Sequence, residues 1–380
     1  MKESLRLGRI AGVAVGINWS VLVIFTLITV GLAAGRFPIL QPDLEPVAYA
    51  VAGLAAGIAF FLSLLAHELS HAIVARRNGV GVDGITLWLF GGVARLTGEA
   101  DDPGADFRIA AVGPAVSVAL GVVFLSLAGA ASAAGLAPLV VEVVVWLGII
   151  NIVLAVFNLV PAAPLDGGRI LRAALWRRSG DRVAAAVTAA RAGRSFGWLL
   201  IIGGFAIFVL GAGLGGLWIV FLGWFLINAA RMEEEQALMG GALSGVRVAD
   251  VMTSGPTTAP DDVTVEQFIE HYVFRNRHST FPLVDRMGRP TGLVTLRRVK
   301  EVPAERRPSM RIGDLACPMD EVAIAQPLEP LEDLLPRMAG CPDGRSLVMD
   351  GPQLVGIVSP TDVMRHLEMA ELRRGGLEQP

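Results

Sequence analysis

Two histidines and a glutamate in an apolar stretch have the types and spacing of a metal-binding pair with a general base. Residues 65–71 read Leu-Ala-His-Glu-Leu-Ser-His, which places His67 and His71 four positions apart with Glu68 between them. Side chains four apart share one face of a helix, so both imidazoles can reach a single metal ion. Glu68 can hold and deprotonate a water molecule there. Purely structural histidines are the alternative, but ionisable groups inside an apolar helix are costly without a partner. We therefore predict a metal site.

A third ligand is expected because catalytic zinc takes three protein ligands and leaves one position open. Among the few carboxylates of the apolar half, Asp166 ends the run Asn-Leu-Val-Pro-Ala-Ala-Pro-Leu-Asp that starts at Asn158. The two prolines exclude a regular helix, so we expect Asp166 on an extended segment, with Gly167 and Gly168 in unusual backbone conformations. A turn or cap residue is the alternative, because Asp-Gly is an ordinary turn signal.

The composition predicts a polytopic α-helical membrane protein. The chain is 53% hydrophobic and only 18% charged, and its long apolar runs lie before residue 231. About 20 apolar residues in a helix cross a bilayer. About six transmembrane helices are expected, at roughly 17–34, 48–74, 107–133, 138–158, 195–211 and 214–230. Asp101, Asp102 and Asp106 fit an acidic helix start before the third span, and Gly113 before Pro114 fits a close helix contact or a kink.

Arginines indicate the orientation of the spans. They follow the second and sixth spans and fill the fourth connection, whereas the opposite loops offer essentially Arg36 alone. The positive-inside rule then places both termini, and the polar part after residue 231, in the cytoplasm. Arg76 and Arg77 end the histidine helix, so the histidines and Asp166 lie near the same face.

A β-hairpin is expected at residues 82–98, between the second and third spans. Two β-type runs flank Gly91-Gly92, and the segment is too short and too rich in glycine to cross as a helix. A surface hairpin is the simple alternative. The apolar tip at residues 87–90 favours a membrane re-entrant hairpin, which must be covered by protein or water.

These motifs together resemble the site-2 protease family of intramembrane zinc metalloproteases. The resemblance covers roughly residues 10–230 and includes the His-Glu-x-x-His pattern, the Asn158–Asp166 run and the phrase at 89–96. It implies that His67, His71 and Asp166 bind one Zn²⁺, that Glu68 is catalytic and that Asn158 positions substrate. The family often has proline where Ala163 stands here, a departure that affects backbone shape and no ligand. The protease domain is expected at residues 1–235.

The polar part contains two copies of one α+β unit, at 246–301 and 310–370. A repeat of roughly 60 residues predicts a pseudo-symmetric pair, and it resembles tandem cystathionine-β-synthase-type (CBS) domains, which often bind adenine nucleotides. The second copy keeps the family pattern with Ser359 and Asp362, whereas Arg298 replaces the aspartate in the first. A purely structural or homodimer-forming module is an equal alternative.

The function predicted from these patterns is a zinc endopeptidase that cleaves membrane-anchored proteins, with the CBS pair as a regulatory or dimerising module. The resemblance suggests regulated proteolysis of transcription or anti-sigma factors. A CBS-regulated metal-ion transporter is the main alternative, although it has no need of Glu68 beside the ligands, and an inactive scaffold is a third. A net charge of −3 gives no case for nucleic-acid binding. Cys317 and Cys341 leave a disulfide open.

Overall fold

The chain folds into two compact units, residues 1–237 and 238–380. The computed structural model describes residues 4–88, 91–98, 100–211, 213, 215–340 and 343–375. Leu89 and Phe90 of the predicted hairpin tip, and Cys341, lie outside the described residues.

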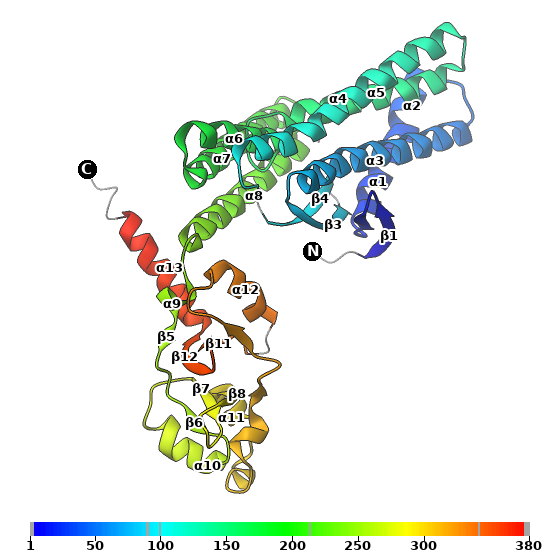
Figure 1. Ribbon diagram of the computed structural model, residues 1–380. Coiled ribbons are helices and arrows are strands. Elements are labelled where there is room, and N and C mark those ends of the chain that lie inside the picture. The colour runs from blue at the N-terminus through cyan, green and yellow to red at the C-terminus, as the bar shows by residue number, and fades with distance from the viewer. Residues whose placement is uncertain are drawn as a thin grey trace. The chain divides into compact units, whose positions relative to one another are not determined.

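The first unit is built mainly from long apolar helices (Figure 1). Its elements are β1 (Leu5–Ile10), β2 (Val13–Ile17), α1 (Val21–Val30), the π-helical η1 (Gly31–Arg36), α2 (Phe37–Leu40), α3 (Pro46–Arg77), β3 (Gly81–Trp88), β4 (Gly91–Thr97), α4 (Pro103–Ala133), α5 (Pro138–Asn158), α6 (Asp166–Ser179), α7 (Arg182–Val209) and α8 (Gly215–Leu243). Within the described residues, 6 helical segments are long and apolar enough to cross a membrane, and the first combines α1, η1 and α2. This confirms the predicted polytopic α-helical class.

The helix boundaries follow capping and proline chemistry. Asp102 begins α4 by accepting hydrogen bonds from the amides of Gly104 (2.8 Å) and Ala105 (2.9 Å). Helix α5 ends at Asn158, before the proline-containing turn that follows it. The fifth span is longer than predicted, because α7 begins at Arg182. The first turns of α7 are rich in alanine but carry Arg182, Arg191 and Arg194, so the predicted span began only after them.

The predicted hairpin is present as β3 and β4, which pair antiparallel. It belongs to a larger sheet, in the order β1-β2-β3-β4, in which β2 and β3 are parallel. Strands β1 and β2 were not predicted, and β2 explains why the first span begins at Val21 rather than at residue 17. One face of the sheet is buried through Val13, Ile85 and Leu87 against α3. Strand β4 forms one edge of the sheet, and it contacts α3.

Helices α7 and α8 pack at glycines. A Cβ built on Gly197 would lie 2.8 Å from the Gly223 carbonyl oxygen, and one on Gly204 would lie 2.7 Å from that of Gly216. Only glycine allows this backbone approach, which is typical of helix pairs in membranes. The pairing of the last two spans therefore has a packing basis.

The second unit contains two similar halves. Its elements are α9 (Val248–Val251), β5 (Thr253–Ser254), β6 (Ala259–Pro260), α10 (Val265–Phe268), η2 (Ile269–Val273), β7 (Thr280–Val284), β8 (Pro290–Thr295), α11 (Leu296–Lys300), η3 (Ala304–Arg306), η4 (Ile312–Leu315), β9 (Cys317–Pro318), β10 (Ala323–Ala325), α12 (Leu331–Gly340), β11 (Ser346–Asp350), β12 (Gln353–Val358) and α13 (Pro360–Gly375).

The two halves exchange a short strand. One sheet has the order β6-β7-β8-β9 and the other β10-β11-β12-β5. Strand β9 comes from the second sequence repeat and β5 from the first, so each sheet is completed by a strand of the other repeat. A buried cluster that includes Leu293 of one sheet and Leu347 of the other joins the halves. Neither repeat forms its complete sheet alone, and the predicted α+β pair is a single folded unit.

Candidate metal centre

Three side chains that are distant in sequence converge between α3 and the start of α6. The Nε2 atoms of His67 and His71 lie 3.2 Å apart, and each lies 3.2 Å from Oδ2 of Asp166. Both histidines are buried, and Asp166 Oδ2 is buried with no hydrogen-bond partner. In the part of the chain that the structure describes, this is the group of His, Cys, Asp and Glu side chains that could hold a metal ion.

The opposite ring nitrogens of the histidines are held by α4. His71 Nδ1 lies 2.6 Å from the Ile109 carbonyl oxygen, and His67 Nδ1 lies 2.9 Å from the Ser117 hydroxyl. Because a carbonyl oxygen only accepts, Nδ1 of His71 carries the proton and donates it. The Nε2 lone pair of a neutral His71 then points at the Asp166 carboxylate, an arrangement that favours a cation between them.

Helix α4 makes room for the histidines with a glycine. Ile109, Gly113 and Ser117 are spaced by four residues and form one stripe that faces the two histidines. A Cβ on Gly113 would overlap Nε2 of His71 and would lie 2.7 Å from Nε2 of His67. The predicted close contact at Gly113 is therefore a contact with the candidate ligands themselves.

The triangle of donor atoms has the size that a tetrahedral zinc site requires. Zinc binds imidazole nitrogen and carboxylate oxygen at about 2.0–2.1 Å, which places tetrahedral ligand atoms about 3.3 Å apart. The three observed separations are each 3.2 Å. Two neutral imidazoles and one carboxylate are also a donor set that zinc prefers. The residues therefore fit the metal that the sequence pattern implies.

Asp166 begins a helix, which corrects the prediction of an extended segment. It is the first residue of α6, and Leu165 before it is extended. The prolines break the chain only upstream, in the turn at residues 159–165, and a carboxylate in the first turn favours the helix dipole. Gly167 and Gly168 are helical rather than unusual in conformation. A Cβ on either would overlap the backbone of that turn, so close approach explains both glycines.

The turn is anchored to α7 through Ala163. The Ala163 amide donates to the Ala189 carbonyl oxygen at 3.2 Å, and the peptide bond to Pro164 is cis. A proline at position 163 has no N–H and could not donate. The departure from the expected family pattern therefore supplies a hydrogen bond at the turn.

Comparisons with known proteins give the family of the chain. A family model for peptidase family M50 matches residues 55–137 and 129–202, and a CBS-domain model matches 248–305 and 312–369. The chain is 48% identical over 373 residues to a protein of Mycobacterium tuberculosis that carries the name zinc metalloprotease Rip3, covering 98% of this chain and 95% of that one. The chain belongs to peptidase family M50. It is a metalloprotease of the site-2 protease type with tandem CBS domains.

Two further relatives have similar descriptions. A zinc metalloprotease of Synechocystis, sll0528, is 31% identical over 319 residues, with 83% of this chain and 82% of the relative covered. The solved site-2 protease from Methanocaldococcus jannaschii has a TM-score of 0.42 and 27% identity, over 60% of this chain and 94% of that chain. With its apolar helices, this M50 protease is a multi-pass membrane protein, and its substrate is a protein.

Glu68 and Asn158 differ in how they relate to the centre. Glu68 directly follows His67 on α3 and lies against Gly92 of β4. Asn158 is the last residue of α5, and its side-chain amide donates to the Leu154 carbonyl oxygen of the same helix at 3.0 Å. Its predicted role toward substrate stays a prediction.

The acidic residues at the start of α4 have separate roles. Asp102 is the helix cap, as the interpretation of an acidic helix start predicted. Asp106 is buried and pairs with two arginines of α6, Arg169 at 3.3 Å and Arg172 at 2.7 Å. The ion pairs therefore join α4 to the helix that Asp166 begins, a link that the sequence pattern did not reveal.

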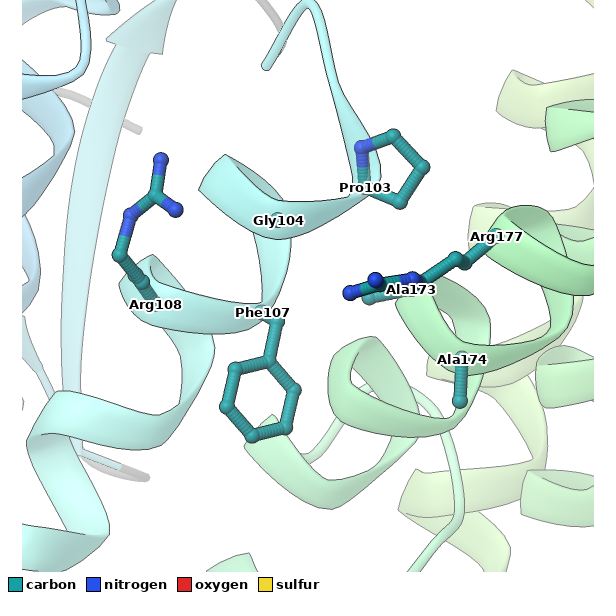
Figure 2. Close-up of a pocket in the computed structure, with 7 residues that line it drawn as sticks. All are labelled: Pro103, Gly104, Phe107, Arg108, Ala173, Ala174 and Arg177. Atoms are coloured by element: carbon teal, nitrogen blue, oxygen red, sulfur yellow. The ribbon is translucent and has the colours of Figure 1, made fainter.

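An open cavity of about 300 Å³ lies between α4 and α6. Figure 2 shows Phe107 of α4 and Arg177 of α6 extending into the space between the helices. Arg108, at its border, donates to the Asn78 side chain at the end of α3 (2.6 Å). None of the three converging residues lines this cavity, so the metal centre is recognised by donor geometry and not by a hollow.

The nucleotide-site positions in the CBS unit are engaged in internal contacts. Asp362 accepts hydrogen bonds from the Ser359 amide (2.9 Å), the Ser359 hydroxyl (2.5 Å) and the Thr253 hydroxyl (3.1 Å). In the first half, Arg298 donates to the carboxylate of Asp343 (2.8 Å), which is nearly fully buried. An arginine in an ion pair thus occupies the place where the family pattern has an aspartate.

Proposed function

We propose that this M50 protease is a zinc endopeptidase that cleaves membrane-anchored proteins within the bilayer. His67, His71 and Asp166 hold one zinc ion, and Glu68 is the general base. The observation that carries the proposal is the triangle of 3.2 Å separations between the three donor atoms, two of which belong to histidines of α3, a helix apolar enough to span a membrane. The matching names of its relatives support zinc as the metal.

The proposed mechanism assigns each residue one task. When bound, zinc supplies a Lewis acid that polarises the scissile carbonyl and lowers the pKa of water. Glu68 takes a proton from the attacking water and delivers it to the leaving amine. Ser117 and the Ile109 carbonyl hold the imidazoles in orientation. Asn158, the last residue of α5, is proposed to position the substrate.

The substrate is proposed to bind as an added strand on β4. A helical substrate keeps its peptide bonds in internal hydrogen bonds, so it must unwind before cleavage. Strand β4 is the edge of its sheet, and an edge offers free backbone donors and acceptors to an extended peptide. Because β4 contacts Glu68 at Gly92, a strand paired to β4 passes beside the general base. The hairpin is proposed to be the re-entrant element.

Both termini and the CBS unit are proposed to be cytoplasmic. The basic loops after α3 and around α6 support this orientation by the positive-inside rule. Membrane-tethered transcription or anti-sigma factors, cleaved near the cytoplasmic face, are the proposed substrates. We propose domain bounds of 1–235, 246–301 and 310–370, with the two CBS repeats acting together because they exchange strands.

The CBS unit is proposed to bind one adenine nucleotide per chain, at Ser359 and Asp362, and to serve in homodimer formation. The Ser359 hydroxyl and the Asp362 carboxylate are the groups that would hold phosphate and ribose. The ion pair of Arg298 with Asp343 argues against an equivalent site in the first half. Titration calorimetry of the full chain with ATP and with AMP tests this: one site, lost in Asp362→Ala and retained in Arg298→Ala, is expected. Two sites would contradict the assignment.

Metal content and substrate loss together test the protease proposal. Purified wild-type chain and Glu68→Gln should each hold about one zinc, whereas Asp166→Ala should hold much less. Quantitative proteomics of membranes from cells that express wild type or Glu68→Gln should reveal single-span proteins shortened only by the wild type. An unchanged zinc content in Asp166→Ala would reject the proposed ligand set. Zinc uptake into vesicles that survives Glu68→Gln, without any shortened protein, would instead support a transporter.

A further inference from the structure

The contact between strand β4 and Glu68 has an unusual basis in two adjacent glycines. Gly91 has a φ of 131°, a conformation that favours glycine, and a Cβ built there would meet no atom within 4 Å. Gly92 shows the opposite pattern. Its φ is not positive, and a Cβ there would overlap Cγ of Glu68 and lie 2.6 Å from its Cδ. Position 92 therefore requires glycine because a side chain would not fit against Glu68, and not because of the backbone conformation.

The backbone N–H of Gly92 belongs to the same contact and faces the Glu68 carboxylate. Alternate N–H groups of an edge strand have no partner strand, and β4 is an edge strand. The hairpin thus offers a backbone donor to the carboxylate next to the metal ligands.

We propose that Gly92 is a positioning residue for Glu68: its missing side chain lets strand β4 lie directly on the carboxylate, and its N–H holds that carboxylate in place. This rests on the proposed role of Glu68 as general base. The hairpin that receives the substrate strand then also orients the base, so substrate pairing and proton transfer share one strand. A methyl group at position 92 forces the Glu68 side chain to rotate but leaves the three metal ligands untouched.

The test uses an inhibitor that reports on the carboxylate without any protein substrate. Acetohydroxamate chelates a catalytic metal and passes its proton to a neighbouring carboxylate, so its affinity depends on where that carboxylate lies. Full-length chain in detergent micelles is loaded with Co²⁺, whose visible spectrum reports binding. The variants are Gly92→Ala, Glu68→Gln and the double variant. Gly129→Ala on α4 is the matched control, because a Cβ there meets nothing within 4 Å.

Gly92→Ala is expected to keep its metal and to bind acetohydroxamate about 10-fold more weakly, as Glu68→Gln does. The double variant should bind no more weakly than Glu68→Gln alone, because both changes act on one interaction. Two outcomes would overturn the role of Gly92 without affecting that of Glu68. One is wild-type acetohydroxamate affinity in Gly92→Ala while the affinity of Glu68→Gln is reduced, and the other is an additive loss of affinity in the double variant. Wild-type affinity in Glu68→Gln would instead reject Glu68 as the base.

A second measurement approaches the contact from the other side, so the proposal does not depend on Gly92→Ala folding. In Glu68→Ala the Gly92 amide loses its acceptor and should exchange with deuterium faster than in wild type, by about 10-fold. The amide of exposed Asp83 on β3 should not change. Unchanged exchange at Gly92 would contradict the proposed hydrogen bond.

Discussion

The carboxylate of Asp106 is clamped by Arg172 through two parallel hydrogen bonds, from Nε at 2.9 Å and from Nη2 at 2.7 Å. Asp106 is 1% exposed, so this two-point ion pair is buried. It joins α4, which contacts both histidines, to α6, which begins with Asp166. Arg172 also lies 3.7 Å from Glu233 on α8, so three helices meet at one guanidinium.

Removal of the Asp106 charge should loosen the whole centre. Asp106→Asn leaves Arg172 and Arg169 short of a buried counter-charge, and we expect a loss of about 3 kcal/mol in stability. Because α6 is then less firmly held, zinc affinity should also fall. Thermal unfolding in detergent and zinc analysis measure both effects. Exposed Asp101→Asn, at the same end of α4, is the control and should match wild type. If Asp106→Asn is destabilised but binds zinc normally, the ion pair stabilises the fold without affecting the metal site.

The glycine between the histidines should be indispensable for metal binding. In Gly113→Ala the new methyl carbon overlaps His71 Nε2, and a ligand atom has no alternative position on the same face of α3. We expect zinc affinity to fall by more than about 100-fold, measured by competition with a chelator. Gly129→Ala, on the same helix with open space around it, should bind zinc normally. A metal-loaded Gly113→Ala would show that the helices can separate at this point.

The local parts of this molecule were predictable, and the parts that depend on contacts across space were not. The histidine pair needed only helical periodicity, and the hairpin only its β-type runs and glycines. The helix at Asp166 was missed because the prolines upstream forbid a helix before Leu165 but not after it. The hairpin of β1 and β2 is local and was predictable but missed, whereas the parallel pairing of β2 with β3 gives no local signal because it joins residues as far apart as Val15 and Ile85. The strand exchange between the CBS repeats is non-local in the same way.

The contributions of Gly92 and Ser117 illustrate the limit at the site itself. Each is defined by the side chain that it faces: Glu68 for Gly92, and His67 for Ser117. A signal for Ser117 existed in its spacing of four residues from Gly113, which places both on one stripe of α4. The stripe indicates a role at the metal site only because α3 packs beside it, and the sequence does not show that packing.

The buried ion pair of the CBS unit should stabilise that unit. Asp343 accepts from Arg298 at 2.8 Å and from the more exposed Arg297 at 3.2 Å. Asp343→Asn removes the charge that both arginines face, and we expect a loss of about 2 kcal/mol. Exposed Asp320→Asn is the matched control. Differential scanning of the full chain should show the loss in the transition of the CBS unit, with zinc content unchanged. Equal stability of the two variants would contradict a structural role for the pair.

The hydroxyl of Ser117 should tune the metal site without being essential to it. It lies 2.9 Å from His67 Nδ1, and such partners of metal-binding histidines fix the ring orientation and raise its basicity. We expect Ser117→Ala to weaken zinc binding by about 10-fold while the fold is retained. The matched control is Ser63→Ala on α3, whose buried hydroxyl donates to the Ala59 carbonyl oxygen of its own helix at 3.0 Å. Chelator competition on both variants measures the difference. Equal zinc affinity in the two would show that the helix backbone alone orients His67, and the effect of α4 on the centre would then rest on Gly113 and the Ile109 carbonyl.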